Sequence, residues 1–197
     1  MTWDERYSTD DFVYGTDPND YLASVADRLT PGDLLTIAEG EGRNAVFLAG
    51  LGHRVTAVDS SAVGLAKAQR LAAHKGVTLT TETGDLADFD PGQARWQTVV
   101  SIFCHLPSAL RAALFSRLVA ALRPGGLLVL EAYTPDQLAY GTGGPKDIDM
   151  LPTLAALQHE LAGLEFHIAR EIVRPVNEGR FHTGDGAVVQ VLARKPE

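Results

Sequence analysis

Short apolar runs alternate with helical patterns along most of the chain. The apolar runs occupy residues 34–38, 54–58, 77–82, 98–104, 127–132 and 187–193. Stretches in which apolar residues recur every three or four positions occupy residues 45–49, 63–75, 108–123 and 154–161. Continuous apolar strands separated by helices are typical of a parallel sheet that is covered on both faces. The pattern therefore predicts an α/β protein with a doubly wound, mostly parallel sheet.

Local signals mark the ends of two of these helices. Ser60 and Ser61 suit the N-cap of the helix that Gly76 is expected to end. Leucines recur at i+4 spacing within residues 108–123, and the Pro-Gly-Gly run at residues 124–126 is expected to stop that helix.

The last third of the chain has a different character. Residues 165–174 alternate between apolar and polar side chains, residues 177–179 are turn-like, and residues 187–193 form a last apolar run. This pattern predicts an antiparallel hairpin added to the edge of the sheet, which then has seven strands. The glycine-rich residues 141–149 are the best candidate for a mobile surface loop.

Composition and charge narrow the class of protein. The chain has 197 residues, which suits one domain, and a formal net charge of −8, which opposes binding to nucleic acid. No apolar run approaches the ~18 residues that a membrane span needs. The single cysteine excludes an internal disulfide and fits a cytoplasmic protein, and the histidines lack metal-ligand spacing, so no metal is expected. We expect a monomer or a weak homodimer.

The loop after the first predicted strand carries the clearest chemical signal. Residues Gly40 to Ala45 match the dinucleotide fingerprint G-x-G-x-x-A, although a tight strand-to-helix turn gives the same match. Glu39 and Glu41 flank Gly40, and two carboxylates facing a pyrophosphate are unfavourable. S-adenosylmethionine instead brings a sulfonium and an ammonium group, which carboxylates attract. The loop therefore favours S-adenosylmethionine over a nicotinamide dinucleotide.

Two further acids follow predicted strands. Asp59 lies 17 residues after Gly42, where a carboxylate can accept hydrogen bonds from both ribose hydroxyls of either cofactor. It could also cap the following helix. Asp85 follows the third strand and could accept from an adenine amino group, or it could be a turn residue.

These residues together resemble the class I S-adenosylmethionine-dependent methyltransferases, a Rossmann-like family. Residues 39–42 resemble the first motif, Asp59 and Asp85 the acids after strands two and three, and residues 122–126 the turn before strand five. The chain also resembles one branch of this family more narrowly, the tellurite-resistance and thiopurine methyltransferases. This resemblance rests on residues 3–7, Tyr14-Gly15 and Pro18-Asn19. The segments 40–45 and 131–135 fit that branch too.

The resemblance implies the organisation of one domain, residues 1–197. Residues 1–17 are expected to form a lid over the cofactor, residues 18–134 the cofactor-binding core, and residues 135–197 the C-terminal helix and hairpin. The expected cofactor contacts are Trp3, Tyr14, Glu39, Gly40, Glu41, Gly42, Asn44, Asp59, Ser60, Asp85, Leu86 and Phe103.

The sequence departs from the family at the end of strand one. The family usually has an acid and, two residues later, a glycine, where Thr36 and Ala38 stand here. Glu39 stands where a small residue is usual. Glu39 could replace the missing acid, or it could point away from the cofactor.

The acceptor is expected over the ends of strands four and five. His105 could orient an acceptor or remove its proton, or its nitrogens could be satisfied by backbone. Tyr133 ends strand five, and Arg180 and His182 lie in or beside the hairpin turn, where with Arg6 they could bind an anion. Cys104 is expected to be a buried filler.

These residues predict methyl transfer from S-adenosylmethionine to a small-molecule acceptor that is soft and thiol-like or an oxyanion. Methyl transfer needs alignment of donor and acceptor more than acid–base machinery, so the absence of a catalytic triad does not count against an enzyme. A non-catalytic S-adenosylmethionine-binding module remains as an alternative, as does a nicotinamide-dependent oxidoreductase.

Overall fold

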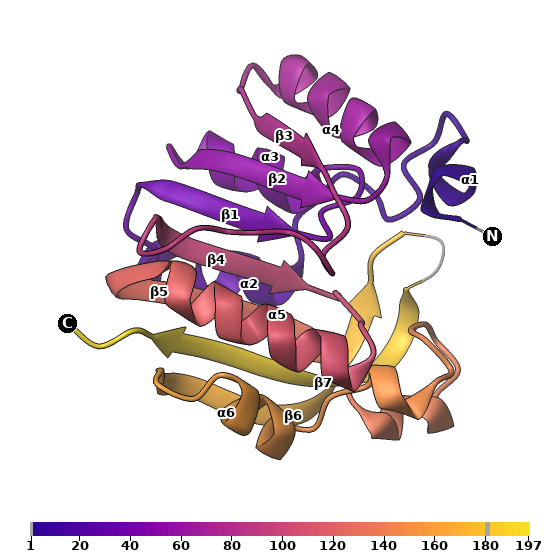
Figure 1. Cartoon of the computed structure of the whole chain (residues 1–197). Coiled ribbons are helices and arrows are strands. Elements are labelled where there is room, and N and C mark those ends of the chain that lie inside the picture. The colour runs from indigo at the N-terminus through magenta and orange to yellow at the C-terminus, as the bar shows by residue number, and fades with distance from the viewer. Residues whose placement is uncertain (1, 180–181) are drawn as a thin grey trace.

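The chain folds around one twisted sheet, seen here in a computed structural model that describes residues 2–179 and 182–197. The sheet has seven strands in the order β3-β2-β1-β4-β5-β7-β6 (Figure 1). The strands are β1 Asp33–Ile37, β2 Arg54–Asp59, β3 Thr80–Thr83, β4 Trp96–Ile102, β5 Leu122–Tyr133, β6 Glu165–Asn177 and β7 Thr183–Arg194. Strands β1 to β5 pair in parallel, and β7 pairs antiparallel with both β5 and β6. The predicted doubly wound sheet with its C-terminal antiparallel hairpin is confirmed.

Helices cover both faces of this sheet. They are α1 Trp3–Tyr7, α2 Asp20–Val25, α3 Arg43–Gly50, α4 Ala62–Lys75, α5 Ser108–Ala121 and α6 Leu154–Glu160, with 3-10 turns η1 Ala26–Arg28, η2 Pro135–Ala139 and η3 Ile148–Met150. The predicted ends of α4 are confirmed: the Ser61 hydroxyl accepts from the Gly64 N–H at 3.0 Å, and Gly76 ends the helix in the left-handed conformation.

Side chains alternate between the two faces along each central strand. In β5, Leu128 and Leu130 pack toward α5 and α6, whereas Val129 packs toward α2, α3 and α4. All three are at most 1% exposed. Full burial of such a side chain contributes roughly 1.5–3 kcal/mol. The two-sided core explains why the strands are apolar throughout.

One expectation about an element boundary was wrong, and two helices were not predicted. The Pro-Gly-Gly run at residues 124–126 lies inside β5 rather than in a turn, because its backbone pairs with Lys195: the Gly125 N–H donates to the Lys195 carbonyl at 2.9 Å, and the Lys195 N–H to the Gly126 carbonyl at 2.8 Å. The helices α1 and α2 were not expected. Each has few residues, and α1 is marked only by a capping box between Thr2 and Glu5.

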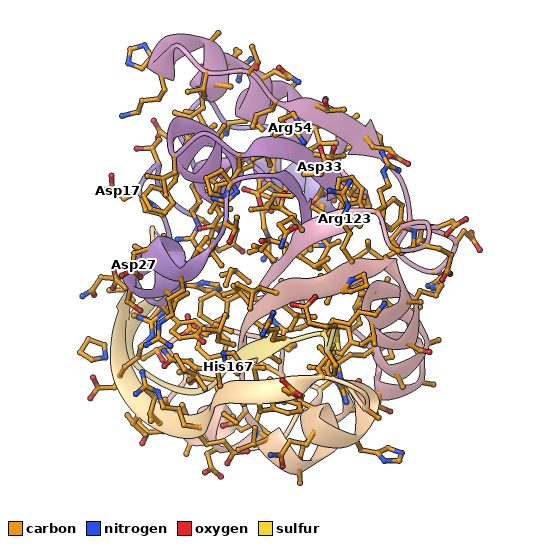
Figure 2. The ribbon with its side chains drawn as sticks, turned by 90° about the vertical axis from the view of Figure 1, so that its left-hand side faces the viewer. Asp17, Asp27, Asp33, Arg54, Arg123 and His167 are labelled. Carbon is orange, nitrogen blue, oxygen red and sulfur yellow. The ribbon has the colours of Figure 1, made fainter. Side chains whose placement is uncertain are left out.

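The two edges of the sheet differ in their chemistry. At the amino ends of the strands, Asp33 lies between Arg54 and Arg123, with N–O distances of 2.8 and 3.0 Å (Figure 2). These groups are partly or largely exposed, and such pairs contribute at most about 1 kcal/mol. Helix α1 lies instead at the carboxyl ends, as do the last residues of β6 and the first residues of β7 (Figure 1). A ligand site is expected at that edge.

Gly42, at the N-terminal end of α3, lies in close contact with α4. Its φ is +91°, and a Cβ there would lie 2.5 Å from the Ala68 side chain and 2.7 Å from its Cα. We expect Gly42→Ala to lower the free energy of unfolding by about 2–4 kcal/mol, through backbone strain and overpacking. Gly50, at the end of the same helix, has open space around it. In urea titrations Gly50→Ala should be neutral or slightly stabilising, and equal stability of the two variants would contradict the packing argument.

Candidate functional site

A cavity of about 500 Å³ lies at the carboxyl ends of β1, β2 and β4. The loops after these strands form its floor, α1 and residues 14–15 cover it, and His182 with residues 143–145 closes one side. The residues expected from sequence that line it are Trp3, Arg6, Tyr14, Glu39, Glu41, Asn44, Asp59, Ser60, Asp85, Leu86, Phe103, His105 and His182. The expected residues that do not line the cavity are Gly40, Gly42 and Tyr133. Arg180 lies outside the described residues. Residues from segments far apart in the sequence thus meet in one cavity.

The glycine loop between β1 and α3 is shaped by its contact with α1. Gly40 has a φ of +62°, and a Cβ there would lie 2.6 Å from the Tyr7 hydroxyl oxygen. Ala38 adopts a φ of +50°, a conformation that favours glycine. The loop therefore keeps a left-handed backbone at the position where the resembling family has glycine.

Asp59, the last residue of β2, joins this loop to α4. One carboxylate oxygen accepts from the Gly40 N–H and the other from the Ser61 N–H, both at 2.8 Å. Burial raises the pKa of Asp59, and the backbone donors oppose that shift. The side chain is 6% exposed and lines the cavity. Carboxylate oxygens have further lone pairs, so a ligand hydroxyl can still donate to it.

Glu39 caps the amino end of α3 from inside the cavity wall. One carboxylate oxygen accepts from the Asn44 N–H at 3.1 Å and the Ala45 N–H at 2.8 Å, while Gly42 at the N-cap has no side chain to do so. Burial raises the pKa of Glu39 to about 7. In the described part of the chain, no ion pair involves this carboxylate. Glu39 is therefore a buried acid that a cationic ligand would stabilise in its charged form.

Glu41 is held differently from Glu39. Its carboxylate forms an ion pair with Lys67 of α4, and both side chains are nearly inaccessible. A carboxylate oxygen also accepts from the Val13 N–H at 2.7 Å. Sequence reasoning assigned Glu41 to the cofactor alone. It gave no signal for Lys67, whose place in a helical pattern reads as an ordinary surface lysine.

Strand β4 ends in a constrained turn. Phe103 adopts a φ of +52°, and its N–H donates to the Glu131 carbonyl at 2.7 Å. His105 Nε2 accepts from the Tyr133 N–H at 3.0 Å, and the ring also hydrogen-bonds the Phe103 backbone. Burial lowers the pKa of His105 to about 3. Its imidazole is neutral and engaged by backbone, the less reactive of the two alternatives seen in the sequence.

Aromatic rings line the wall beyond this turn. Phe103 stacks on Tyr133 with ring centroids 4.6 Å apart, and the His182 ring meets Phe103 at 4.8 Å, Tyr133 at 5.4 Å and Tyr14 at 4.9 Å. The buried Tyr133 hydroxyl has no hydrogen-bond partner among the described residues, and the buried His182 Nδ1 lies 3.9 Å from the Glu178 carboxylate. This part of the cavity is apolar, with two polar atoms set into it.

A buried polar cluster lies behind the rings. Glu178 accepts from Asn19 at 2.7 Å and pairs with Arg43 at 2.5 Å, and Arg174 bonds to both Glu178 and Glu131. Burial opposes ionisation of Glu178, but the His182, Arg43 and Arg174 interactions hold its pKa down to about 2. Asn19 also donates to Glu131 at 2.6 Å. The sequence does not predict this cluster as a unit, because its members come from segments that lie far apart in the chain.

Other chemistry is not indicated by the described residues. Burial raises the pKa of the Cys104 thiol to about 12, which suits an inert filler. Residues 2–179 and 182–197 contain no group of three potential metal ligands. None of the helices in those residues is both long enough and apolar enough to cross a membrane.

Comparison with known proteins identifies the fold and one domain. Residues 34–126 match a family model described as a methyltransferase domain. None of the curated proteins is detectably similar in sequence to this chain. Among solved structures, a protein studied for conversion of a disulfide bond into a thioacetal group during echinomycin biosynthesis has a TM-score of 0.79 at 20% identity, over 98% of this chain and 88% of that chain.

Two further structures carry the same fold. TehB from Haemophilus influenzae has a TM-score of 0.75 at 18% identity, over 98% of this chain and 65% of its own. Magnesium protoporphyrin IX methyltransferase from Synechocystis PCC 6803, solved with bound SAH, has a TM-score of 0.66 at 20% identity, over 89% of this chain and 79% of its own. At these identities the likeness establishes the fold.

The raised pKa of Glu39 predicts a pH-dependent stability of the ligand-free protein. The folded state holds the proton up to about pH 7, whereas the unfolded chain releases it near 4.5. The free energy of unfolding should therefore fall as pH rises between these values, by at most about 3 kcal/mol. Glu39→Gln keeps an oxygen for the two N–H donors and removes the titration. In urea titrations it should match the wild type near pH 4.5 and exceed it at pH 8; equal stability at pH 8 would refute the assignment.

Proposed function

We propose that this chain, which has the methyltransferase domain and the fold of the class I S-adenosylmethionine-dependent methyltransferases, transfers a methyl group to a small-molecule nucleophile. The observation that carries the proposal is the cavity of about 500 Å³ at the carboxyl ends of β1, β2 and β4, with buried carboxylates on one side and aromatic rings on the other. Each half suits one of the two partners in methyl transfer.

The carboxylate half fits S-adenosylmethionine. Glu39 is buried in the glycine loop and forms no ion pair within the described residues, and the cofactor carries an ammonium and a sulfonium group. We assign Asp59 to the ribose hydroxyls, because its oxygens lie at the end of β2 and retain free lone pairs. Asp85 and Leu86, after β3, would border the adenine, and Trp3 and Tyr14 would cover the cofactor from above.

The aromatic half fits the acceptor. When bound, S-adenosylmethionine supplies a methyl group already activated by a sulfonium, so the protein has mainly to align the acceptor and exclude water. Phe103 and His182 border that volume and Tyr133 backs it. We assign His105 to positioning, since its backbone hydrogen bonds fix the ends of β4 and β5 relative to each other. Tyr133, His182 and Arg180 remain our candidates for contact with the acceptor.

The size and the polarity of the cavity suggest the class of acceptor. Pockets of roughly 300–1,000 Å³ hold one drug-sized ligand, so a cavity of about 500 Å³ that also holds the cofactor leaves room for few further atoms. Aromatic walls favour soft, polarisable groups such as sulfur. The acceptor we propose is therefore a small soft nucleophile, thiol-like or an oxyanion.

Removal of Asp59 should weaken cofactor binding. Charge-assisted hydrogen bonds contribute about 1.5–3 kcal/mol each, so Asp59→Ala should raise the dissociation constant for S-adenosylhomocysteine at least tenfold in titration calorimetry. Asp33→Ala, which removes an exposed carboxylate from the opposite edge, should leave it unchanged. The wild type should bind S-adenosylhomocysteine and not NADH. Unchanged affinity of Asp59→Ala would exclude the ribose assignment, and preference for NADH would favour an oxidoreductase.

Turnover should depend on the aromatic wall and require a small acceptor. We expect S-adenosylhomocysteine to form in the presence of small thiols or oxyanions and not with peptides or RNA. His182→Ala should lower kcat/KM for the acceptor at least tenfold while cofactor affinity stays within twofold, because His182 lies on the acceptor side. Turnover with RNA or peptides alone would contradict the proposal, and binding without turnover on any acceptor would favour a non-catalytic binding module.

A further inference from the structure

Lys67 occupies a position that the proposed reaction does not use. It lies in the middle of α4, it is 1% exposed, and its ammonium group points into the protein. The ammonium donates to the backbone carbonyls of Thr9 at 2.9 Å and Asp11 at 2.6 Å, with a longer contact to Tyr7 at 3.5 Å. It also lies 5.2 Å from the centroid of the Phe12 ring. The buried Lys67 ammonium group therefore binds the N-terminal segment at several residues between Tyr7 and Phe12.

Glu41, the ion-pair partner of Lys67, binds the residues that follow in the same N-terminal segment. The Glu41 carboxylate pairs with Lys67 and accepts from the Val13 N–H at 2.7 Å, with a longer contact to the Tyr14 N–H at 3.4 Å. The lysine thus binds the carbonyls of Tyr7, Thr9 and Asp11, and the glutamate binds the N–H groups of residues 13–14. We call residues 7–14, held in this way, the strap.

The strap covers the cofactor half of the cavity. Tyr7 and Tyr14 both line the cavity, and their ring centroids lie 6.4 Å apart. The Tyr7 side chain packs closely against two glycines: a Cβ on Gly40 would lie 2.6 Å from its hydroxyl oxygen, and a Cβ on Gly64 would lie 2.9 Å from its ring. Glu41 belongs to the glycine loop itself, so the strap is tied to the loop that would hold the cofactor.

The strap also contacts the hairpin on the acceptor side. A Cβ on Gly179 would lie 2.3 Å from the Val13 carbonyl oxygen and 2.4 Å from the Tyr14 Cα, so the hairpin turn packs directly on the strap backbone. The Tyr14 ring in turn meets His182 at 4.9 Å. A displaced strap would open both halves of the cavity together.

We propose that Lys67 is a positioning residue: the buried Lys67–Glu41 pair holds the strap closed over the cavity and so determines how tightly the cofactor is retained. This inference rests on the proposed function. The strap buries the side chains of Tyr7 and Val13, and its backbone groups also need partners once they are buried. Lys67 and Glu41 supply those partners, and each neutralises the other's charge.

The test replaces both charges at once. Lys67→Met alone would leave Glu41 as an unpaired buried anion and could unfold the chain, whereas joint replacement of a buried pair by apolar residues is often neutral. The main variant is therefore Lys67→Met with Glu41→Met. Glu41→Gln is a milder second variant, because its amide oxygen can still accept from Val13. Lys195→Met is the matched control, because the Lys195 ammonium also donates to three backbone carbonyls away from the cavity. These are the carbonyls of Val119, Ala120 and Leu122.

Two measurements separate positioning from a general loss of stability. In titration calorimetry, the double variant should bind S-adenosylhomocysteine at least tenfold more weakly than the wild type, because a strap that is closed only part of the time lowers apparent affinity by that fraction. Hydrogen exchange in residues 2–17 should be slowed by S-adenosylhomocysteine in the wild type and not in the double variant. Glu41→Gln should lie between them. Lys195→Met should retain wild-type affinity and protection even if its melting temperature falls.

The outcomes distinguish this inference from the proposed function. Wild-type affinity and protection in a folded double variant would overturn the role of Lys67 and leave the proposed function standing. A similar loss of affinity in Lys195→Met would also overturn it, because stability alone would then account for the effect. A wild-type chain that fails to bind S-adenosylhomocysteine would overturn both.

Discussion

Buried carboxylates at the carboxyl edge of the sheet are the constraint on which the site depends. Glu39, Glu41, Asp59, Glu131 and Glu178 are all at most 8% exposed. An ionised carboxylate without donors is strongly unfavourable in a protein interior. Each of these groups therefore fixes the backbone or side chain that supplies its donors. The edge is assembled by electrostatic pairing on a sheet that apolar packing has already formed.

The donors come from segments that apolar packing alone would leave loosely attached. Asp59 accepts hydrogen bonds from N–H groups of the glycine loop and of the residue that precedes α4, and Glu41 accepts hydrogen bonds from N–H groups of the N-terminal strap. Glu131 and Glu178 are bridged by Arg174 and Asn19. Because each acid has local donors or a paired cation, the edge is polar without being strongly charged. Glu39 and Asp59 have backbone donors and no ion pair among the described residues, and both line the cavity, where a cationic ligand would stabilise the charged form of Glu39.

Sequence reasoning found the elements whose signals are local. The apolar strands, the N-cap at Ser61 and the C-cap at Gly76 depend on neighbours in the sequence, and the structure agrees with them. It missed α2, which has a short apolar pattern, and it missed Lys67, because an isolated lysine in a helical pattern gives no sign of burial. The Asn19–Glu131–Glu178 contacts join residues more than one hundred positions apart. Only the fold brings such partners together.

The departure from the family motif at the end of β1 also depends on the donors that a buried carboxylate needs. Threonine at position 36 removes the acid that the resembling family has on the strand, and Thr36 is fully buried in the sheet. Ala38 keeps the left-handed conformation without glycine, at a cost of order 1–3 kcal/mol. That conformation turns the chain so that Glu39 reaches the Asn44 and Ala45 N–H groups from the cavity side. An acid in the loop rather than on the strand thus gains the helix donors that permit its burial, and a cationic ligand would stabilise its charged form. The altered motif is therefore compatible with cofactor binding, because the chemistry needs a carboxylate in the cavity wall rather than at one fixed position of the strand.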